Sequence, residues 1–399
     1  MTKSAILAAL LSPCALVSAS CSAEPAGDSA LPEATVTAEV GEEVTVTSAD
    51  QFKAVSLGTF EEPWAAEFAP GTGVLFITEK AGTMKFVDTA TGRTGTVTGM
   101  PEVDYGGQGG LGDVAFLPSE SSDTLDRRTI YLTWAEAGEG DTRGAALGKG
   151  TLVCAEADAC TVESLSVIWR QQPKVTGRGH YSHRIAFSPD GQYLFLASGD
   201  RQKMEPAQDL SNNLGSVLRL TLDGKPAPGN PFADRGSPSD QIWSYGHRNI
   251  LGLQFDAQGR LWDLEHGPAG GDELNLVVQG ENYGWPVVSD GVHYNGDPIP
   301  DHSTRPEFHA PAISWDPVIA PGDFVFYSGK LWPEWQGQAI IGAMKPTAVV
   351  RVAIEGDKAT EAARYPFEKR VREILEGPDG ALWILEDGED GRLVRLTPR

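Results

Sequence analysis

Apolar and polar residues alternate along most of this chain in short runs that are separated by turns. One phrase recurs: a loop, a short apolar run, a turn rich in Gly, Pro or Asp, and a second apolar run. Runs bounded in this way are typical of β-hairpins rather than of helices. The phrase occurs at residues 64–80, 110–134, 184–200, 251–265, 323–343 and 372–387. Repetition of one hairpin along a chain indicates a radial repeat.

The repeat predicts an all-β fold, namely a six-bladed β-propeller of four-stranded antiparallel blades around a central channel. Glycine (46 residues) and proline (27 residues) are frequent, which favours many strands over long helices. The propeller is expected to occupy residues 51–399 as one domain. No internal run is apolar for long enough to span a bilayer, so we expect no transmembrane segment.

The first 21 residues predict an export signal, with Lys3 near the start, an apolar body, and small residues before Cys21. Cys21 also loosely fits a lipoprotein cleavage box, so ordinary cleavage and a lipid anchor at Cys21 both stay open. Residues 22–50 are rich in Ala, Glu, Thr, Pro and Gly, which predicts a flexible acidic leader. The expected location is exported and periplasmic.

Net charge and cysteine content limit the kinds of partner and metal site that the protein is expected to have. The formal charge of −23 argues against a nucleic-acid partner, because phosphate binding needs a basic face. Beyond the export signal, Cys154 and Cys160 are the cysteines of the folded body. An oxidising compartment favours a disulfide between them. They are isolated from His and further Cys, so a zinc site is not expected.

The residues that precede each hairpin face the same end of the predicted channel and form a cup. These positions hold Gln108, residues 180–184 with His180, Arg248 with Asn249, and Arg370 with Arg372. Lys345 lies just past its hairpin, after Met344, so its place in the cup is less direct. Four cations gathered in an acidic protein suit a small polyanion, since guanidinium groups match carboxylates in pairs. A solvated loop charge is the alternative for each one taken alone.

Two further features bring chemistry to the cup. His180 lies in the same cup as Asp200, a carboxylate that could orient an imidazole and raise its basicity. Gly267 and Pro268 follow a strand and offer backbone carbonyls, which are good calcium ligands. The alternatives are a structural histidine and a tight turn. No glycine-rich loop opens a helix, so nucleotide cofactors have no evident site.

Several motifs carry a resemblance to a known family. They occur in the order GQGGLGDVAFLP, HYSHRIAFSPDG, QDLSNNLGSVLRL, IWSYGHRN, EHGPAGGDELN, NYGWP and RVREILEGPDG. With them the chain resembles, from Pro63 to Leu396, the soluble aldose sugar dehydrogenases of the glucose/sorbosone dehydrogenase family, which depend on pyrroloquinoline quinone (PQQ). The family fold is a six-bladed propeller, in agreement with the hairpin repeat.

The resemblance implies a role for each cup residue. His180 is the general base on the anomeric hydroxyl, Asp200 its partner, and Arg248 holds the quinone oxygen that becomes negative. The remaining PQQ contacts are implied for Gln108, Asn249, Lys345, Arg370 and Arg372. Calcium on the carbonyls of Gly267 and Pro268 is implied to act as a Lewis acid on the quinone.

The resemblance also implies a second, structural calcium site at Glu273 and the carbonyl of Tyr283, supported by Asp272; a capped turn is the alternative. Four positions depart from the family pattern: His183 replaces a small residue, Ala269 a common Arg, Ile250 a common Pro and Gly112 a common Leu. Variable loops supply substrate contacts in this family. The candidates for such contacts are His293, Tyr294, Trp315 and Tyr327.

The expected function is oxidation of the C1 hydroxyl of aldose sugars to lactones, with PQQ and Ca²⁺ as cofactors. The electrons would pass to an external acceptor, which could be a quinone, a cytochrome or a dye. Two alternatives stay open at this point. One is a calcium-dependent propeller lactonase, which would use metal-bound water and no quinone. The other is a non-catalytic carbohydrate-binding propeller, because a fold alone does not fix function.

Overall fold

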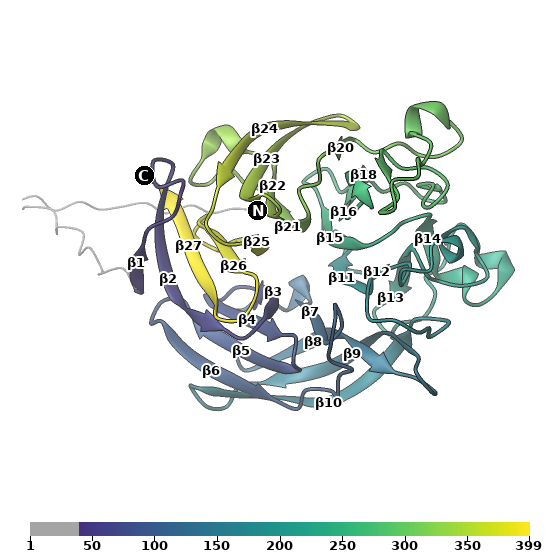
Figure 1. The fold of residues 1–399 in the computed structure, drawn as a ribbon. Coiled ribbons are helices and arrows are strands. Elements are labelled where there is room, and N and C mark those ends of the chain that lie inside the picture. The colour runs from purple at the N-terminus through teal and green to yellow at the C-terminus, as the bar shows by residue number, and fades with distance from the viewer. Residues whose placement is uncertain (1–39) are drawn as a thin grey trace, which may run out of the picture. The chain divides into compact units, whose positions relative to one another are not determined.

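The computed structural model describes residues 40–399, and this part of the chain is built almost entirely of β-strands (Figure 1). Helical structure in this range is limited to short 3-10 turns. They are η1 (Pro118–Glu120), η2 (Glu205–Gln208), η3 (Ala233–Arg235), η4 (Ser239–Gln241), η5 (His302–Thr304) and η6 (Pro333–Trp335). The all-β prediction is therefore confirmed.

Most sheets of the described range are built from strands that are near one another in the sequence, and one sheet also joins the first strands to the last. One sheet holds β1 (Glu42–Val44), β2 (Phe52–Phe60), β27 (Gly391–Pro398), β26 (Leu382–Glu386) and β25 (Val371–Glu376), in that order. The next holds β3 (Pro63–Phe68), β4 (Val74–Glu79), β5 (Thr83–Asp88), β6 (Arg93–Thr98), β10 (Ala159–Arg170), β9 (Arg143–Val153), β8 (Arg127–Ala137) and β7 (Leu111–Phe116). In this larger sheet β6 and β10 pair in parallel, whereas the other neighbours are antiparallel.

The remaining sheets are smaller. One contains β11 (Ser182–Phe187), β12 (Tyr193–Ser198), β13 (Ser216–Thr221) and β14 (Ile242–Tyr245), and another β15 (Ile250–Phe255), β16 (Leu261–Glu265), β18 (Asp272–Leu276) and β20 (Ile313–Trp315). A third contains β21 (Pro321–Phe326), β22 (Ala339–Met344), β23 (Thr347–Glu355) and β24 (Lys358–Pro366). The short strands β17 (Ala269–Gly270) and β19 (Gly291–Val292) pair with each other.

All six hairpins expected from the sequence are present within residues 40–399. They are β3–β4, β7–β8, β11–β12, β15–β16, β21–β22 and β25–β26. In every one, the register shifts near the beginning of the first strand. Such an irregularity bends a strand and changes where its side chains point. Its recurrence shows that the hairpins are equivalent structural units.

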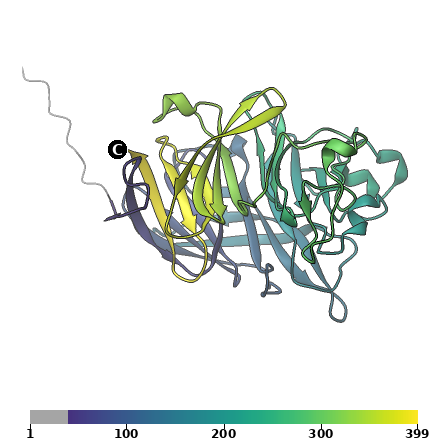
Figure 2. The same cartoon turned by 45° about the horizontal axis from the view of Figure 1, so that its top comes forward.

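The first strands of these hairpins contact one another in a closed cycle. The order is β3, β7, β11, β15, β21, β25 and back to β3. Figure 1 shows these strands at the centre with the later strands outside them, and the tilted view of Figure 2 shows the sheets following one another around that centre. The arrangement of the described residues is therefore propeller-like.

The two ends of the described range meet in one sheet. Strand β27 lies between β2 and β26, and Ala54 pairs with Leu396. The side chains between this sheet and the β21–β24 sheet form an apolar core around Phe52, on which Trp332 and Trp335 pack edge-on. Because first and last strands share the sheet, the ring of sheets is closed by main-chain hydrogen bonds.

Other sequence expectations concern the termini and the cysteines. The predicted export signal, the lipid anchor at Cys21 and most of the leader lie outside the described residues. Strand β1 pairs with β2, so ordered chain begins before the predicted boundary at residue 51. The disulfide between Cys154 and Cys160 is formed and joins the end of β9 to β10. Over residues 40–399, no helix is long and apolar enough to cross a membrane.

Candidate active site

The cup predicted from the hairpin phase exists as a cavity of about 160 Å³. It lies where first strands begin and second strands end, and in an antiparallel hairpin these two points are at the same side. Four of the predicted site residues line it, namely Gln108, Asn249, Arg370 and Arg372. Other lining residues are Trp64, Lys80, Tyr181, His183, Leu251, His266 and Met344.

His180 lies at the entrance to β11 and is buried. Its backbone N–H donates to Oε1 of Gln108 at 2.7 Å, and its Nδ1 lies 2.7 Å from Oδ1 of Asp200. The other carboxylate oxygen of Asp200 accepts the indole N–H of Trp285 at 2.8 Å. An ionised carboxylate only accepts hydrogen bonds, so Nδ1 of His180 carries the proton and Nε2 keeps its lone pair.

The electrostatics of this pair suit a base. Burial lowers the pKa of His180, and this outweighs the opposite effect of Asp200, so the imidazole is neutral near neutral pH. Burial acts to raise the pKa of Asp200, but the hydrogen bond and charge of His180 outweigh it and the pKa of Asp200 is lowered. The pair is therefore a neutral imidazole held by a carboxylate, which can take up a proton.

Arg248 is next to this pair at the start of β15. The carbonyl of Arg248 accepts the backbone N–H of Asp200, and its guanidinium lies over the indole of Trp285. Nη1 donates to the carbonyl of His266 at 3.1 Å and Nη2 to the hydroxyl of Tyr294 at 3.1 Å. The buried Nε of Arg248 has no hydrogen-bond partner within residues 40–399. A fixed cation with spare donor capacity thus lies beside the base.

The two arginines of the last hairpin share one carboxylate. Asp387 lies 2.9 Å from Nε of Arg370 and 2.6 Å from Nη2 of Arg372. The side chain of Arg370 is 53% exposed and that of Arg372 only 14%. Asp387 therefore holds the guanidinium groups of Arg370 and Arg372, both of which line the cup. A carboxylate of a ligand in the cup would meet these preorganised donors.

Some polar atoms in and beside the cup have hydrogen-bonding capacity left over for a ligand. Oδ1 of Asn249 is buried and has no hydrogen-bond partner in the described part of the chain. An unpaired buried acceptor is costly unless a ligand satisfies it. Together with the unpaired Nε of Arg248 and the forks of Arg370 and Arg372, it forms a donor and acceptor set that fits a planar polyanion such as PQQ.

The segment between β16 and β17 offers backbone oxygens to a cation. Asp272 accepts the N–H of Gly267 at 2.8 Å and that of Ala320 at 2.6 Å, which holds the Gly267–Pro268 peptide in place. A Cβ on Gly267 would lie 2.2 Å from the carbonyl oxygen of Gly271, so only glycine fits this close approach. A small cavity of about 10 Å³ is lined by Gly267 and Pro268. Its oxygen-rich lining is the donor chemistry that calcium prefers.

The residues expected at a second calcium site lie close together. Glu273 and Tyr283 line the same small cavity as Gly267 and Pro268. The carbonyl of Tyr283 lies 3.1 Å from Nε2 of His302, and Nδ1 of His302 lies 3.8 Å from Oε1 of Glu273. The imidazole of His302 thus bridges both groups. The sequence analysis did not identify this histidine.

Several residues do not lie where the sequence placed them. Arg184, which was grouped with His180, is buried at the opposite end of the first strands. Trp315 and Tyr327 were candidates for substrate contact, but both are buried in apolar clusters. Lys345 is exposed and does not line the cavity, although it follows β22 at the cup end. Of the loop candidates, Tyr294 contacts Arg248.

His183 and Gly112, two of the positions that depart from the family pattern, lie against each other. The His183 ring is buried, stacks on Tyr181 and meets Trp64 edge-on. A Cβ on Gly112 would lie 2.7 Å from Cγ of His183. The imidazole therefore fills space that a larger side chain at position 112 would need.

Some site residues were missed by the sequence analysis. Lys80, His266 and Asp387 come directly after the second strands of their hairpins, one position earlier than the predicted Asp200, which is the second residue after β12. The hairpin repeat contained this signal, because a second strand returns to the end at which the first began. Trp285 had no such signal, since its contact with Asp200 joins segments that are distant in the chain.

Known structures share this architecture. A glucose dehydrogenase crystal structure has 36% sequence identity and a TM-score of 0.80, covering 87% of this chain and 100% of that chain. The PQQ-bound form of aldose sugar dehydrogenase from Streptomyces coelicolor has 26% identity and a TM-score of 0.69, covering 88% of this chain and 99% of that chain. The fold therefore belongs to a class of propeller-like sugar dehydrogenases.

Sequence comparison identifies the family. The model of the family described as glucose / sorbosone dehydrogenase matches residues 60–395. Aldose sugar dehydrogenase YliI of Escherichia coli (strain K12) is 35% identical over 346 residues, which cover 85% of this chain and 91% of that protein. The chain belongs to the glucose/sorbosone dehydrogenase family.

Proposed function

We propose that this protein is a PQQ-dependent aldose sugar dehydrogenase that oxidises the C1 hydroxyl of aldoses to lactones. Its family membership supports the enzyme class, an oxidoreductase acting on CH–OH donors. The observation that carries the proposal is the His180–Asp200 pair beside Arg248. It is next to a cup that Arg370 and Arg372 line, and the backbone N–H of His180 donates to Gln108 of that lining.

The finer fold assignment is part of the proposal. Six blades of four strands are supported by the six equivalent hairpins and by the closed cycle of their first strands. The eight-stranded sheet is then two blades, β3–β6 and β7–β10, which meet along the parallel contact of β6 with β10. In this arrangement the cup lies at one end of the central channel.

In the proposed reaction, His180 removes the proton of the C1 hydroxyl through Nε2. Asp200 fixes the ring orientation and stabilises the imidazolium that forms. When bound, PQQ supplies the acceptor for the hydride that leaves C1, and calcium on Gly267 and Pro268 supplies a Lewis acid. Arg248 stabilises negative charge that develops at the end of the cup beside His180.

Binding of the cofactor is assigned to the remaining polar residues. Arg370 and Arg372 pair with its carboxylates, while Gln108 and Asn249 supply hydrogen bonds. Lys345 adds a positive charge at the rim. Glu273 and Tyr283 are proposed to hold the second calcium ion, with His302 adjacent to both.

The cellular setting follows from the same proposal. The predicted export signal over residues 1–21 would deliver the enzyme to the periplasm, free or anchored through Cys21. The substrate is an aldose, and a quinone, a cytochrome or a dye accepts the electrons. The formal charge of −23 argues against a nucleic-acid partner.

The experiment is a titration of purified apoprotein with PQQ, with and without calcium, followed by a panel of aldoses and a dye acceptor. We expect saturable PQQ binding that calcium strengthens, and turnover with at least one aldose. Arg372→Gln should weaken PQQ binding by about tenfold or more, because a charge-assisted pair is lost. Arg364→Gln, on the outer strand β24, is the matched control and should leave binding unchanged.

Three results would contradict the proposal. PQQ binding without turnover of any aldose would exclude the reaction. Lactone hydrolysis that needs calcium but not PQQ would instead identify a lactonase, and sugar affinity without PQQ affinity would identify a carbohydrate-binding propeller.

A further inference from the structure

A second and larger cavity lies at the other end of the first strands. Its volume is about 360 Å³, and it shares no lining residue with the cup. The cup is lined by the starts of the first strands, such as Trp64 and Leu251, whereas this cavity is lined by their later residues, such as Phe68 and Phe255. A cavity of this size is large enough for a small organic ligand.

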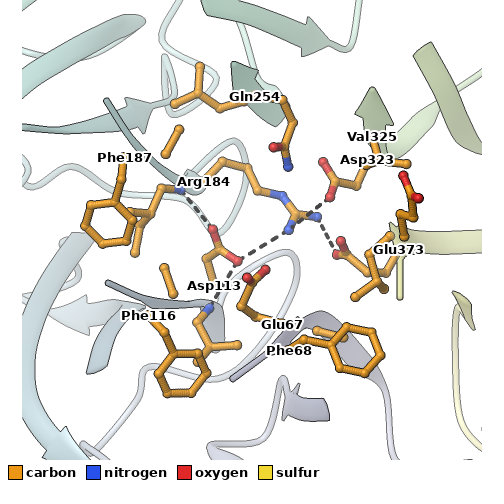
Figure 3. Close-up of a pocket in the computed structure, with 18 of the residues that line it drawn as sticks. Glu67, Phe68, Asp113, Phe116, Arg184, Phe187, Gln254, Asp323, Val325 and Glu373 are labelled. Atoms are coloured by element: carbon orange, nitrogen blue, oxygen red, sulfur yellow. Dashed lines mark hydrogen bonds and ion pairs between the residues drawn. The ribbon is translucent and has the colours of Figure 1, made fainter. Parts of the chain in front are cut away.

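The lining of this cavity is strongly acidic. Four carboxylates lie around the Arg184 guanidinium, namely Glu67, Asp113, Asp323 and Glu373, and a fifth lining carboxylate, Glu376, pairs with Ser328 instead. Figure 3 shows four of them arranged about the Arg184 fork. Nη2 of Arg184 donates to Glu373 at 2.8 Å, and Nη1 lies 3.4 Å from Asp113. One cation cannot pair with all of these carboxylates. Burial raises the pKa of Glu67 to about 8 and the pKa of Glu373 well above its usual range, so part of the set is protonated near neutral pH and the other carboxylates carry the negative charge.

Part of that charge has no partner. Oδ2 of Asp323 lies 3.6 Å from Nη1 of Arg184, but Oδ1 of the same carboxylate is buried without a hydrogen bond in the described part of the chain, and the side chain is only 4% exposed. Glu67 also lines the cavity, and Figure 3 shows no hydrogen bond to its carboxylate. By contrast, Asp113 accepts the N–H groups of Val114 and Ile185. The free acceptors are therefore on the Glu67 and Asp323 side.

The surroundings of Glu67 disfavour its ionised form. Burial, followed by the charges of Asp113 and Asp323, raises the pKa of Glu67 to about 8, against which Arg184 acts only weakly. A cation placed beside Glu67 would remove this cost.

The geometry decides which kind of cation fits. Arg184 occupies the meeting point of the carboxylates, so they do not converge on one small centre. Within residues 40–399 three acidic or histidine ligands converge closely at His247, Asp263 and Glu265, which is elsewhere. Aromatic rings at the ends of four first strands also line the cavity, namely Phe68, Phe116, Phe187 and Phe255. Rings beside carboxylates attract an alkylammonium group more than a compact metal ion.

We propose that this cavity binds a small organic cation, namely a primary alkylammonium whose N–H groups are accepted by Glu67 and Asp323. The alkyl part would lie against the phenylalanine rings near the mouth, where Phe187 and Phe255 are partly exposed. The site is separate from the proposed redox cup and does not depend on PQQ.

The test uses the full-length chain and 1,4-diaminobutane as probe in isothermal titration calorimetry. We expect saturable binding, no binding of 1,4-butanediol, and a dissociation constant that rises by about tenfold or more in Glu67→Gln, because a charged acceptor is lost. Glu355→Gln removes the same charge from an exposed position at the end of β23 and should bind like the unmodified chain.

The competing outcomes are distinct. If Ca²⁺ or Mg²⁺ binds at a Glu67-dependent site and the diamine does not, the cavity is a metal site and the proposal is wrong. Diamine binding that survives Glu67→Gln, or no binding to the unmodified chain, also overturns it. Thermal unfolding of each variant shows whether it is folded, and Asp323→Asn provides a second test if Glu67→Gln is not.

Discussion

His180 adopts a backbone conformation that few residues of its type occupy. Its φ is +50°, in the left-handed region. Gly199 supports it, since a Cβ at that position would lie 2.1 Å from the carbonyl oxygen of His180. Such strain is held only where the surroundings fix it, and here Gln108 and Asp200 do so. The position of the imidazole is thus determined before any ligand arrives.

Replacement of this histidine tests its role directly. His180→Ala should lower kcat by about 100- to 10,000-fold, because general base catalysis is typically worth that much. PQQ affinity should be unchanged, since the ring is not among the groups that pair with the cofactor carboxylates. Stopped-flow reduction by sugar and PQQ titration measure the two effects separately. Full activity in this variant would remove His180 from the mechanism.

Gly112 and His183 should be energetically coupled. Gly112→Leu alone should destabilise the fold by about 1–3 kcal/mol, because the added side chain collides with the His183 ring. In combination with His183→Ala, which vacates that space, part of this loss should be recovered. Urea unfolding of both single variants and the double variant gives the coupling free energy. Strictly additive effects would mean that the two positions do not share space.

At the level of elements, the hairpins could be predicted from the sequence, because each consists of two apolar runs separated by a turn rich in Gly, Pro or Asp. The cup followed from hairpin phase, which explains why Gln108, Asn249 and Arg372 were found. The sheet partners of β1 and the contact of β6 with β10 could not be read, because they depend on long-range pairing. Arg184 was misplaced since a register shift early in β11 determines where its side chain points.

Strand β27 is the element on which closure depends. It pairs with β2 and β26, and it buries Leu393, Val394 and Leu396. Exposure of three such side chains costs roughly 5–9 kcal/mol, which is comparable with a whole domain stability of roughly 5–15 kcal/mol. Deletion of residues 391–399 should therefore abolish cooperative thermal unfolding, whereas deletion of the exposed Arg399 should not. A cooperative transition in the longer deletion would refute this role.

Across the whole molecule, the two ends of the channel have opposite character. Arg370 and Arg372 line the cup, Arg248 lines the small cavity beside it, and the carboxylate-rich cavity lies at the other end of the first strands. Arg184 links them structurally, because it contacts the carbonyl of Leu251, Asp113 and Glu373 on three different first strands. Its guanidinium also lies over the ring of Trp64, which lines the cup. The buried side chain of Arg184 thus contacts several first strands at a position between two chemically distinct cavities.

The excess charge predicts how stability depends on pH. The pKa of Glu67 is raised from 4.5 to about 8 by burial and by Asp113 and Asp323, so the folded chain holds a proton that the unfolded chain releases. Raising the pH from 4.5 to about 8 therefore removes stability. Glu67→Gln, which resembles the protonated acid, should match the unmodified chain in acid and be more stable at alkaline pH. Urea unfolding at both ends of this range checks it, with Glu355→Gln as control; equal pH profiles for all three chains would show that Glu67 is ionised and solvated in the folded state.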